Sequence, residues 1–167
     1  MLTDRTWLRT TASALALFVA VVVATPAPGQ MAHHTAISPD KVEWKPGPPT
    51  LPPGAQMAVF AGSPLKEGPF IMRLKFPAGF VIPPHRHPRE EALTVISGGF
   101  GMGIGEKHDR NAAPLLPAGG FFIMPAGVAH FAWTERETIT QVNGIGPFVV
   151  EYINPDDDPR KKQAGSK

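Results

Sequence analysis

Turn-forming residues interrupt this chain so often that a long helix has no room in it. The sequence holds 20 prolines and 17 glycines, and from Met57 onward they separate short apolar segments that end at Gly, Pro or Asn turns. The segments span residues 57–61, 70–76, 92–96, 120–124, 138–142 and 148–153. None of them continues the 3.6-residue apolar repeat of an amphipathic helix. Regularly spaced short strands predict an all-β fold, an antiparallel barrel or sandwich.

Composition narrows the possible partners and chemistries. The chain has 167 residues, of which 43% are hydrophobic, enough for one domain with a packed core. Its formal net charge is only +2, and the basic residues at 160–162 lie beside acidic residues at 156–158. We expect no nucleic-acid partner, because phosphate binding needs a sustained basic surface. The chain has no cysteine, which excludes disulfides, thiolate metal ligands and cysteine nucleophiles.

The first 27 residues have the order of a secretory signal. Arg5 and Arg9 precede an uncharged apolar run at residues 12–24, and small and turn-forming residues follow at 25–29. This order predicts a cleavable signal peptide, with cleavage after Ala24 or after Ala27. The apolar run is shorter than the roughly 20 residues of a helical membrane span, so we expect no stable span. The predicted location is therefore periplasmic or secreted.

The remaining chain is predicted to have three parts. A proline-rich N-terminal arm covers residues 28–56, the β-barrel covers 57–155, and a polar C-terminal tail covers 156–167. In the arm, residues 41–44 alternate between polar and apolar and predict an edge strand, while the prolines that follow forbid a helix. Val42 and Trp44 give the arm apolar surface for docking. We expect it to pack on a barrel, its own or a partner's, and the chain to form a homodimer.

Three potential metal ligands lie within one short segment. Residues 79–98 read GFVIPPHRHPREEALTVISG. His85 and His87 are two residues apart, so in a strand their imidazoles point to the same face. Glu91 follows at the same parity, across a Pro88-Arg89 turn, and a returning strand can bring its carboxylate to the point where the imidazoles converge. Glu90 has the opposite parity, and we expect it to face solvent.

A third histidine completes a nitrogen and oxygen ligand set. Residues 119–130 read GGFFIMPAGVAH, in which residues 125–127 form a turn and His130 starts the next strand. Imidazole and carboxylate groups suit several divalent transition metals. We therefore predict that His85, His87, Glu91 and His130 bind one divalent metal ion.

These two segments resemble the two sequence motifs of the cupin superfamily. The first motif is a Gly, five residues, His-x-His, three or four residues, Glu, six residues and Gly; the matching residues are Gly79, His85, His87, Glu91 and Gly98. The second is a Gly, five residues, Pro-x-Gly, two residues, His, three residues and Asn; the matching residues are Gly119, Pro125, Gly127 and His130. Thr134 stands where the family usually has Asn. The resemblance covers about residues 57–155.

The resemblance implies an antiparallel jelly-roll β-barrel with a metal ion in its mouth. Cupins hold iron, manganese, nickel, copper or zinc through such a three-His, one-Glu set, and they include dioxygenases, decarboxylases, isomerases, lyases and non-enzymatic binders. The chain offers no clear general acid or base besides the metal itself, so a reaction would run mostly at the metal. We expect a small-molecule metalloenzyme of oxygenase type, with lyase, isomerase and decarboxylase activities behind it. The alternative is a non-catalytic cupin that binds metal or a small ligand.

Several other residues have two possible roles. His33, His34 and His108 are expected to be solvated or loop residues rather than ligands. Arg73 either holds a carboxylate substrate inside the barrel or faces outward with Lys75, while Met72 and Leu74 face inward. Gln141 and Trp133 either line a pocket or simply pack. Five phenylalanines are expected in the core rather than in a substrate platform: Phe80, Phe121, Phe122, Phe131 and Phe148.

Overall fold

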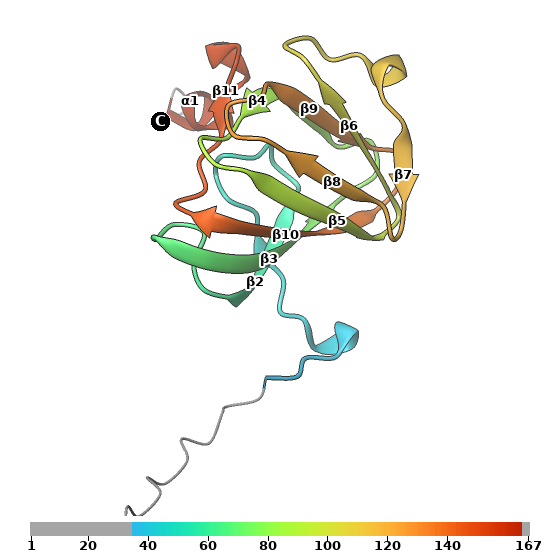
Figure 1. Ribbon diagram of the computed structural model, residues 1–167, viewed down its shortest axis with the longest axis vertical. Helices are drawn as coiled ribbons and strands as arrows, with labels where there is room; N and C mark the ends of the chain where they lie inside the picture. Colours follow the sequence, from blue (N-terminus) through green and yellow to red (C-terminus); the bar gives the residue numbers. More distant parts are fainter. Residues whose placement is uncertain (1–34, 165–167) are drawn as a thin grey trace, which may run out of the picture. The chain divides into compact units, whose positions relative to one another are not determined.

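Two antiparallel sheets pack face to face in the computed structural model, which describes residues 35–164 (Figure 1). One sheet has the strand order β1 (Lys45–Pro46), β2 (Gln56–Ala61), β3 (Gly68–Phe76), β10 (Thr138–Gly146), β5 (Glu91–Ser97) and β8 (Phe121–Met124). The other has the order β11 (Glu151–Tyr152), β4 (Val81–Arg86), β9 (His130–Thr134), β6 (Gly99–Ile104) and β7 (Leu115–Pro117). The predicted all-β, antiparallel fold is confirmed, and the topology is consistent with a jelly roll. The predicted signal segment, His33 and His34 lie outside the described residues.

Alternating side chains build the core between the sheets. In β3 the residues Phe70, Met72, Leu74 and Phe76 are buried, while Ile71 is exposed and the two basic residues between them are half-buried. The same alternation places Leu93 and Val95 of β5 inside, with exposed fractions of 2% and 1%. The period of two therefore directs one face of each strand inward.

The predicted strands match the structure except at the last predicted strand and at two strands that the prediction missed. The predictions at 57–61, 70–76, 92–96, 120–124 and 138–142 correspond to β2, β3, β5, β8 and β10. The predicted strand at 148–153 is shorter, since only Glu151–Tyr152 pairs. The prediction missed β6 and β7. Strand β6 reads GFGMGI, and glycine there signals a turn in sequence, yet its residues 100–104 all pair with β9.

Residues 44–56 of the N-terminal arm pack on the chain's own barrel, which is one of the two predicted alternatives. The edge strand predicted at 41–44 is wrong: Pro39–Lys41 forms a 3-10 turn, and the paired residues are Lys45–Pro46, opposite Met57 and Gln56. Proline favours the first position of a helical turn, which explains the difference. Trp44 docks through its ring, with Lys75 Nζ 4.7 Å from the ring centroid.

Short helical turns follow the barrel. A 3-10 turn covers Pro155–Asp157, and helix α1 covers Pro159–Ala164. Arg160 ties this end to the barrel, because its Nη2 donates a hydrogen bond of 3.2 Å to the Val150 carbonyl. Among the described residues, no helix is long and apolar enough to cross a membrane.

Candidate metal centre

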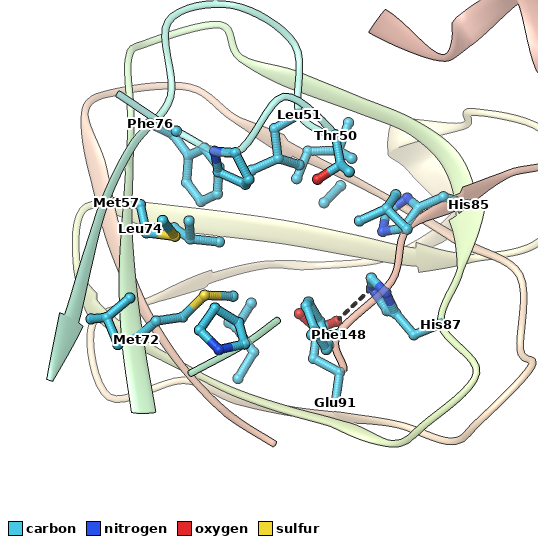
Figure 2. Close-up of a pocket in the computed structure, with 18 of the residues that line it drawn as sticks. Thr50, Leu51, Met57, Met72, Leu74, Phe76, His85, His87, Glu91 and Phe148 are labelled. Atoms are coloured by element: carbon cyan, nitrogen blue, oxygen red, sulfur yellow. Dashed lines mark ion pairs between the residues drawn. The ribbon is translucent and has the colours of Figure 1, made fainter. Parts of the chain in front are cut away.

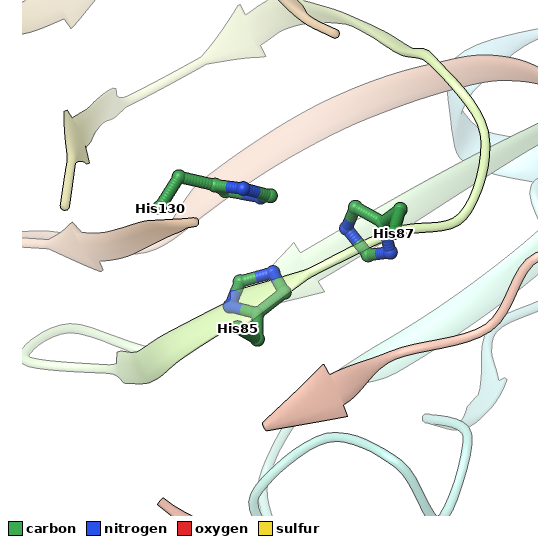
Figure 3. A group of neighbouring side chains, drawn as sticks. All are labelled: His85, His87 and His130. Carbon is green, nitrogen blue, oxygen red and sulfur yellow. The ribbon is translucent and has the colours of Figure 1, made fainter. Parts of the chain in front are cut away.

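Three buried histidines meet between the sheets (Figure 3). His85 lies in β4, His87 follows that strand directly, and His130 is the first residue of β9. Strands β4 and β9 are neighbours, with His85 opposite His130 in the register. The exposed fractions of the three side chains are 4%, 4% and 0%. One ligand atom from each lies within 4.8 Å of the others.

Backbone carbonyls fix the orientation of all three imidazoles. Nδ1 of His85 lies 2.8 Å from the Pro83 carbonyl oxygen, and Nδ1 of His87 lies 2.7 Å from that of Val149. Nδ1 of His130 lies 3.0 Å from the carbonyl oxygen of Val128. Because a carbonyl only accepts, each Nδ1 carries the proton and each Nε2 keeps a free lone pair. This arrangement prepares three nitrogen ligands, as the outer contacts of metal sites commonly do.

Glu91 brings a carboxylate to the same point from the opposite sheet. It is the first residue of β5, and the turn after His87 carries the chain from one sheet to the other. Its Oε2 lies 3.6 Å from Nε2 of His87 and 3.6 Å from Nε2 of His130. Glu91 is 6% exposed, whereas Glu90 is exposed as its parity predicts.

The cluster has the chemistry of a cation site. Nε2 of His130 is buried without a hydrogen-bond partner, and its distance to Glu91 Oε2 exceeds that of a good hydrogen bond. Three imidazole lone pairs and a carboxylate face one another, and all of them are acceptors. Buried acceptors without donors are costly, and a divalent cation at their centre would remove that cost. The residues present therefore fit a divalent metal ion.

Burial and the neighbouring groups set the protonation of the cluster. Burial, reinforced by the imidazoles of His130 and His87, lowers the pKa of His85 to about 3. Burial also lowers the pKa of His87. For Glu91, burial raises the pKa, but the contacts with His130 and His87 outweigh it, so the pKa falls. At neutral pH, His85 and His87 are thus neutral and Glu91 is ionised, which are the forms that bind metals.

A cavity of about 640 Å³ opens beside the cluster (Figure 2). In Figure 2, His85 and His87 lie on one side of it and Met57, Met72 and Leu74 lie across from them. Residues 46–51 of the arm and 62–65 of the β2–β3 loop complete its wall. The inward position of Met72 follows from the alternation in β3. No sequence pattern predicts that the arm forms part of the cavity wall.

Of the remaining candidate residues that the structure describes, Phe148 lines this cavity and the others lie away from it. Arg73 faces outward, where its Nε donates a hydrogen bond of 3.2 Å to Oε1 of Gln141. Trp133 is buried by packing beside Phe131, and His108 is an exposed loop residue near both rings.

Two of the expected core phenylalanines depart from that prediction. Phe121 is 51% exposed on β8, because β8 is an edge strand and Phe121 lies on its outer face. Phe148 lines the cavity and stacks on the ring of His87, with centroids 4.3 Å apart. Sequence reasoning missed this contact, since the segment that carries Phe148 does not pair as a strand.

Comparisons with known proteins agree with this architecture. Residues 63–144 match the family model described as Cupin. Germin-like protein subfamily T member 2 of Arabidopsis thaliana is 35% identical over 79 residues, which cover 44% of this chain and 36% of that protein. The chain thus spans about a third of the length of the curated relatives it matches.

Two solved structures share the fold at low sequence identity. The polyketide cyclase RemF from Streptomyces resistomycificus has a TM-score of 0.58 and 16% identity, over 79% of this chain and 94% of that one. A candidate acetylacetone dioxygenase from Methylibium petroleiphilum has a TM-score of 0.56 and 19% identity, over 81% and 96%. The family model matched by residues 63–144 and the germin-like relatives, together with both motifs, show that the chain belongs to the cupin superfamily.

Proposed function

We propose that this chain is an exported cupin that holds one divalent metal ion through His85, His87, Glu91 and His130, and that it is a small-molecule metalloenzyme of oxygenase type. One observation carries the proposal: four buried acceptors converge at the wall of a largely apolar cavity. Iron, manganese, nickel, copper and zinc all accept such nitrogen and oxygen ligands.

The chain's own residues would orient and protect the reacting molecule. A bound ion supplies the Lewis-acid or redox chemistry that the side chains lack. Three carbonyl contacts hold the imidazoles in place, and the apolar wall excludes water, which strengthens the electrostatic interactions inside. A six-coordinate ion held by four protein ligands leaves about two positions for a substrate.

The oxygenase assignment is tested with the iron(II)-loaded protein. Oxygen consumption is measured across a panel of diketones, catechols and small thiols, with Glu91→Gln as the inactive variant and His108→Ala as a matched histidine control. Elemental analysis of each protein gives the metal content. We expect close to one ion and turnover with at least one substrate in the wild type and in His108→Ala, and loss of turnover in Glu91→Gln. Absence of bound metal from the wild type would refute the proposed centre.

A non-catalytic binder is the second candidate. Among the described residues that line the cavity, only the four proposed ligands could act as acid or base; the other polar side chains are the hydroxyls of Thr50 and Ser63. A binder needs no proton-transfer group, whereas many enzymes do. Tight ligand binding without turnover under all five metals would establish this alternative.

Export and assembly are separate parts of the proposal. The signal segment at residues 1–27 predicts a mature chain that begins at Thr25 or Pro28, and N-terminal sequencing of the protein from culture fractions tests it. The homodimer predicted from the arm is tested by sedimentation equilibrium of the mature protein. A full-length chain found only in the cytoplasm would contradict export, and a monomeric mass at micromolar concentration would contradict the dimer.

A further inference from the structure

The cavity beside the metal centre is charged at one place only. Its charged lining residue is Glu91, and the three histidines adjoin it. Within the described part of the chain, no lysine or arginine lines the cavity, and Arg73 points to the outer face of its sheet. The rest of the wall is aliphatic, aromatic, thioether or proline side chains, apart from the hydroxyls of Thr50 and Ser63.

This distribution of charged and apolar groups limits the chemical class of ligand that the cavity can bind. A charged group placed away from the metal centre would lose its hydration and meet no partner, which is strongly unfavourable. An apolar group at the same place would leave water for an apolar wall, which is favourable in proportion to the area buried. A ligand that fills the cavity therefore has its polar atoms at one end.

Methionines make the far wall adaptable. Met57, Met72 and Met102 line the cavity from three different strands, and Met57 and Met72 lie across from the histidines in Figure 2. Unbranched thioether side chains adjust to apolar bodies of different shape. The wall thus favours apolar ligands without requiring one particular ligand shape.

The arm forms one side of the cavity. Residues 46–51 form part of the wall, and Leu51 is only 7% exposed, so its side chain belongs to the core. Three hydrogen bonds hold this stretch: Tyr152 Oη donates to the Thr50 carbonyl at 2.7 Å, Leu51 N to that of Pro48 at 2.9 Å, and Gly47 N to that of Ala55 at 2.8 Å. These hydrogen bonds therefore hold the part of the wall that contains Leu51 in a fixed position.

We infer that the cavity binds a small molecule with an uncharged apolar body and a single polar head at the His and Glu cluster, and that Leu51 limits the size of that body. The inference rests on the proposed metal centre for the placement of the head. It adds the ligand class and a residue that determines specificity.

A homologous series of ligands tests the inference by binding alone. Zinc-loaded protein, which cannot turn over by redox chemistry, is titrated calorimetrically with alkyl β-diketones of increasing chain length. A parallel series carries a carboxylate at the far end of the same chains. We expect each added methylene to tighten binding by about three- to fourfold until the alkyl chain fills the space beside Leu51. The carboxylate series should gain nothing with length.

Variants of Leu51 test whether this residue sets the size limit of the ligand. Leu51→Ala should extend the series to longer chains, and Leu51→Trp should stop it at shorter ones. Ile37→Ala is the matched control, because Ile37 is 46% exposed, belongs to the same arm and does not line the cavity. Affinity that ignores chain length, equal binding of both series, or a limit unchanged in both Leu51 variants would overturn the inference.

A metal-free measurement separates this inference from the proposed function. The neutral fluorophore N-phenyl-1-naphthylamine brightens in apolar sites, and the chelated protein should bind it with Leu51→Trp weakening that binding. If the protein binds metal but neither the fluorophore nor the diketones, the ligand class is wrong and the metal centre stands. If the fluorophore binds but no metal does, the proposed function fails and the apolar cavity stands.

Discussion

Thr134 and Phe80 are joined by a reciprocal pair of hydrogen bonds. Phe80 N donates to Thr134 Oγ1 at 3.1 Å, and Thr134 N donates to the Phe80 carbonyl at 3.0 Å. The same hydroxyl donates to the Pro77 carbonyl at 2.7 Å. Thr134 ends β9 and Phe80 precedes β4, so these bonds fasten together the two strands that carry His130 and His85. Threonine at the position where the family usually has Asn thus has a structural role.

Replacing Thr134 tests that role. Thr134→Val keeps the shape but removes the hydroxyl, which leaves the Phe80 amide and the Pro77 carbonyl without this partner in a site that is 0% exposed. We expect a loss of about 1–3 kcal/mol in the free energy of unfolding, measured by urea denaturation. Thr134→Ser keeps the hydroxyl and should lose clearly less. Equal stability of the two variants would contradict the assigned role.

Metal binding should raise the stability of the protein. A ligand that binds only the folded state adds about 2.7 kcal/mol to the free energy of unfolding when its free concentration is 100 times its Kd. We expect thermal unfolding to shift upward when metal is added to chelated protein. His87→Ala should abolish the shift, whereas His108→Ala should keep it, because His108 is an exposed loop residue. The same shift in both variants would argue against His87 as a ligand.

Phe148 should support metal affinity without touching the metal. Its ring stacks on His87 at 4.3 Å, next to the Val149 carbonyl that accepts the His87 Nδ1 proton. An aromatic pair is worth about 0.5–1.5 kcal/mol, so Phe148→Ala should weaken zinc affinity by about two- to tenfold, measured by chelator competition. Phe121→Ala, on the exposed face of β8, is the control. Unchanged affinity in Phe148→Ala would show that the carbonyl alone orients His87.

Tyr152 provides a pH signal that reports on the arm. Burial, reinforced by Asp158, raises the pKa of Tyr152, and its hydroxyl donates to the Thr50 carbonyl. Because the folded pKa is raised, this stability is present below the ordinary value of about 10 and is lost as pH rises toward the folded value. The chain has a single tyrosine, so absorbance at 295 nm follows it alone. We expect no phenolate near pH 10 in the folded protein and an ordinary titration in denaturant; matching curves would contradict the anchored arm.

The metal cluster could be predicted from the sequence because local rules place most of it. Parity puts His85 and His87 on one face and separates Glu91 from Glu90, and a single turn brings the carboxylate back. The cavity could not be predicted in this way. Its wall at Leu51 depends on the arm returning to the barrel, and its wall at Phe148 depends on an unpaired segment. Both are long-range packing events that no short motif records.

Glycines in strand β6, which the sequence prediction missed, leave room for the aromatic rings of the neighbouring strand β9. Gly101 lies opposite Trp133 in the register, and a Cβ built there would fall on the indole ring. Trp133 is 2% exposed, so the ring has little room to move. We expect Gly101→Ala to lower the free energy of unfolding by about 1–3 kcal/mol through overpacking, measured by urea denaturation. Gly99→Ala is the matched control in the same strand, since its Cβ would meet the flexible end of Leu115 at 3.2 Å. A Gly101→Ala protein as stable as Gly99→Ala would show that β9 can shift, and with it His130.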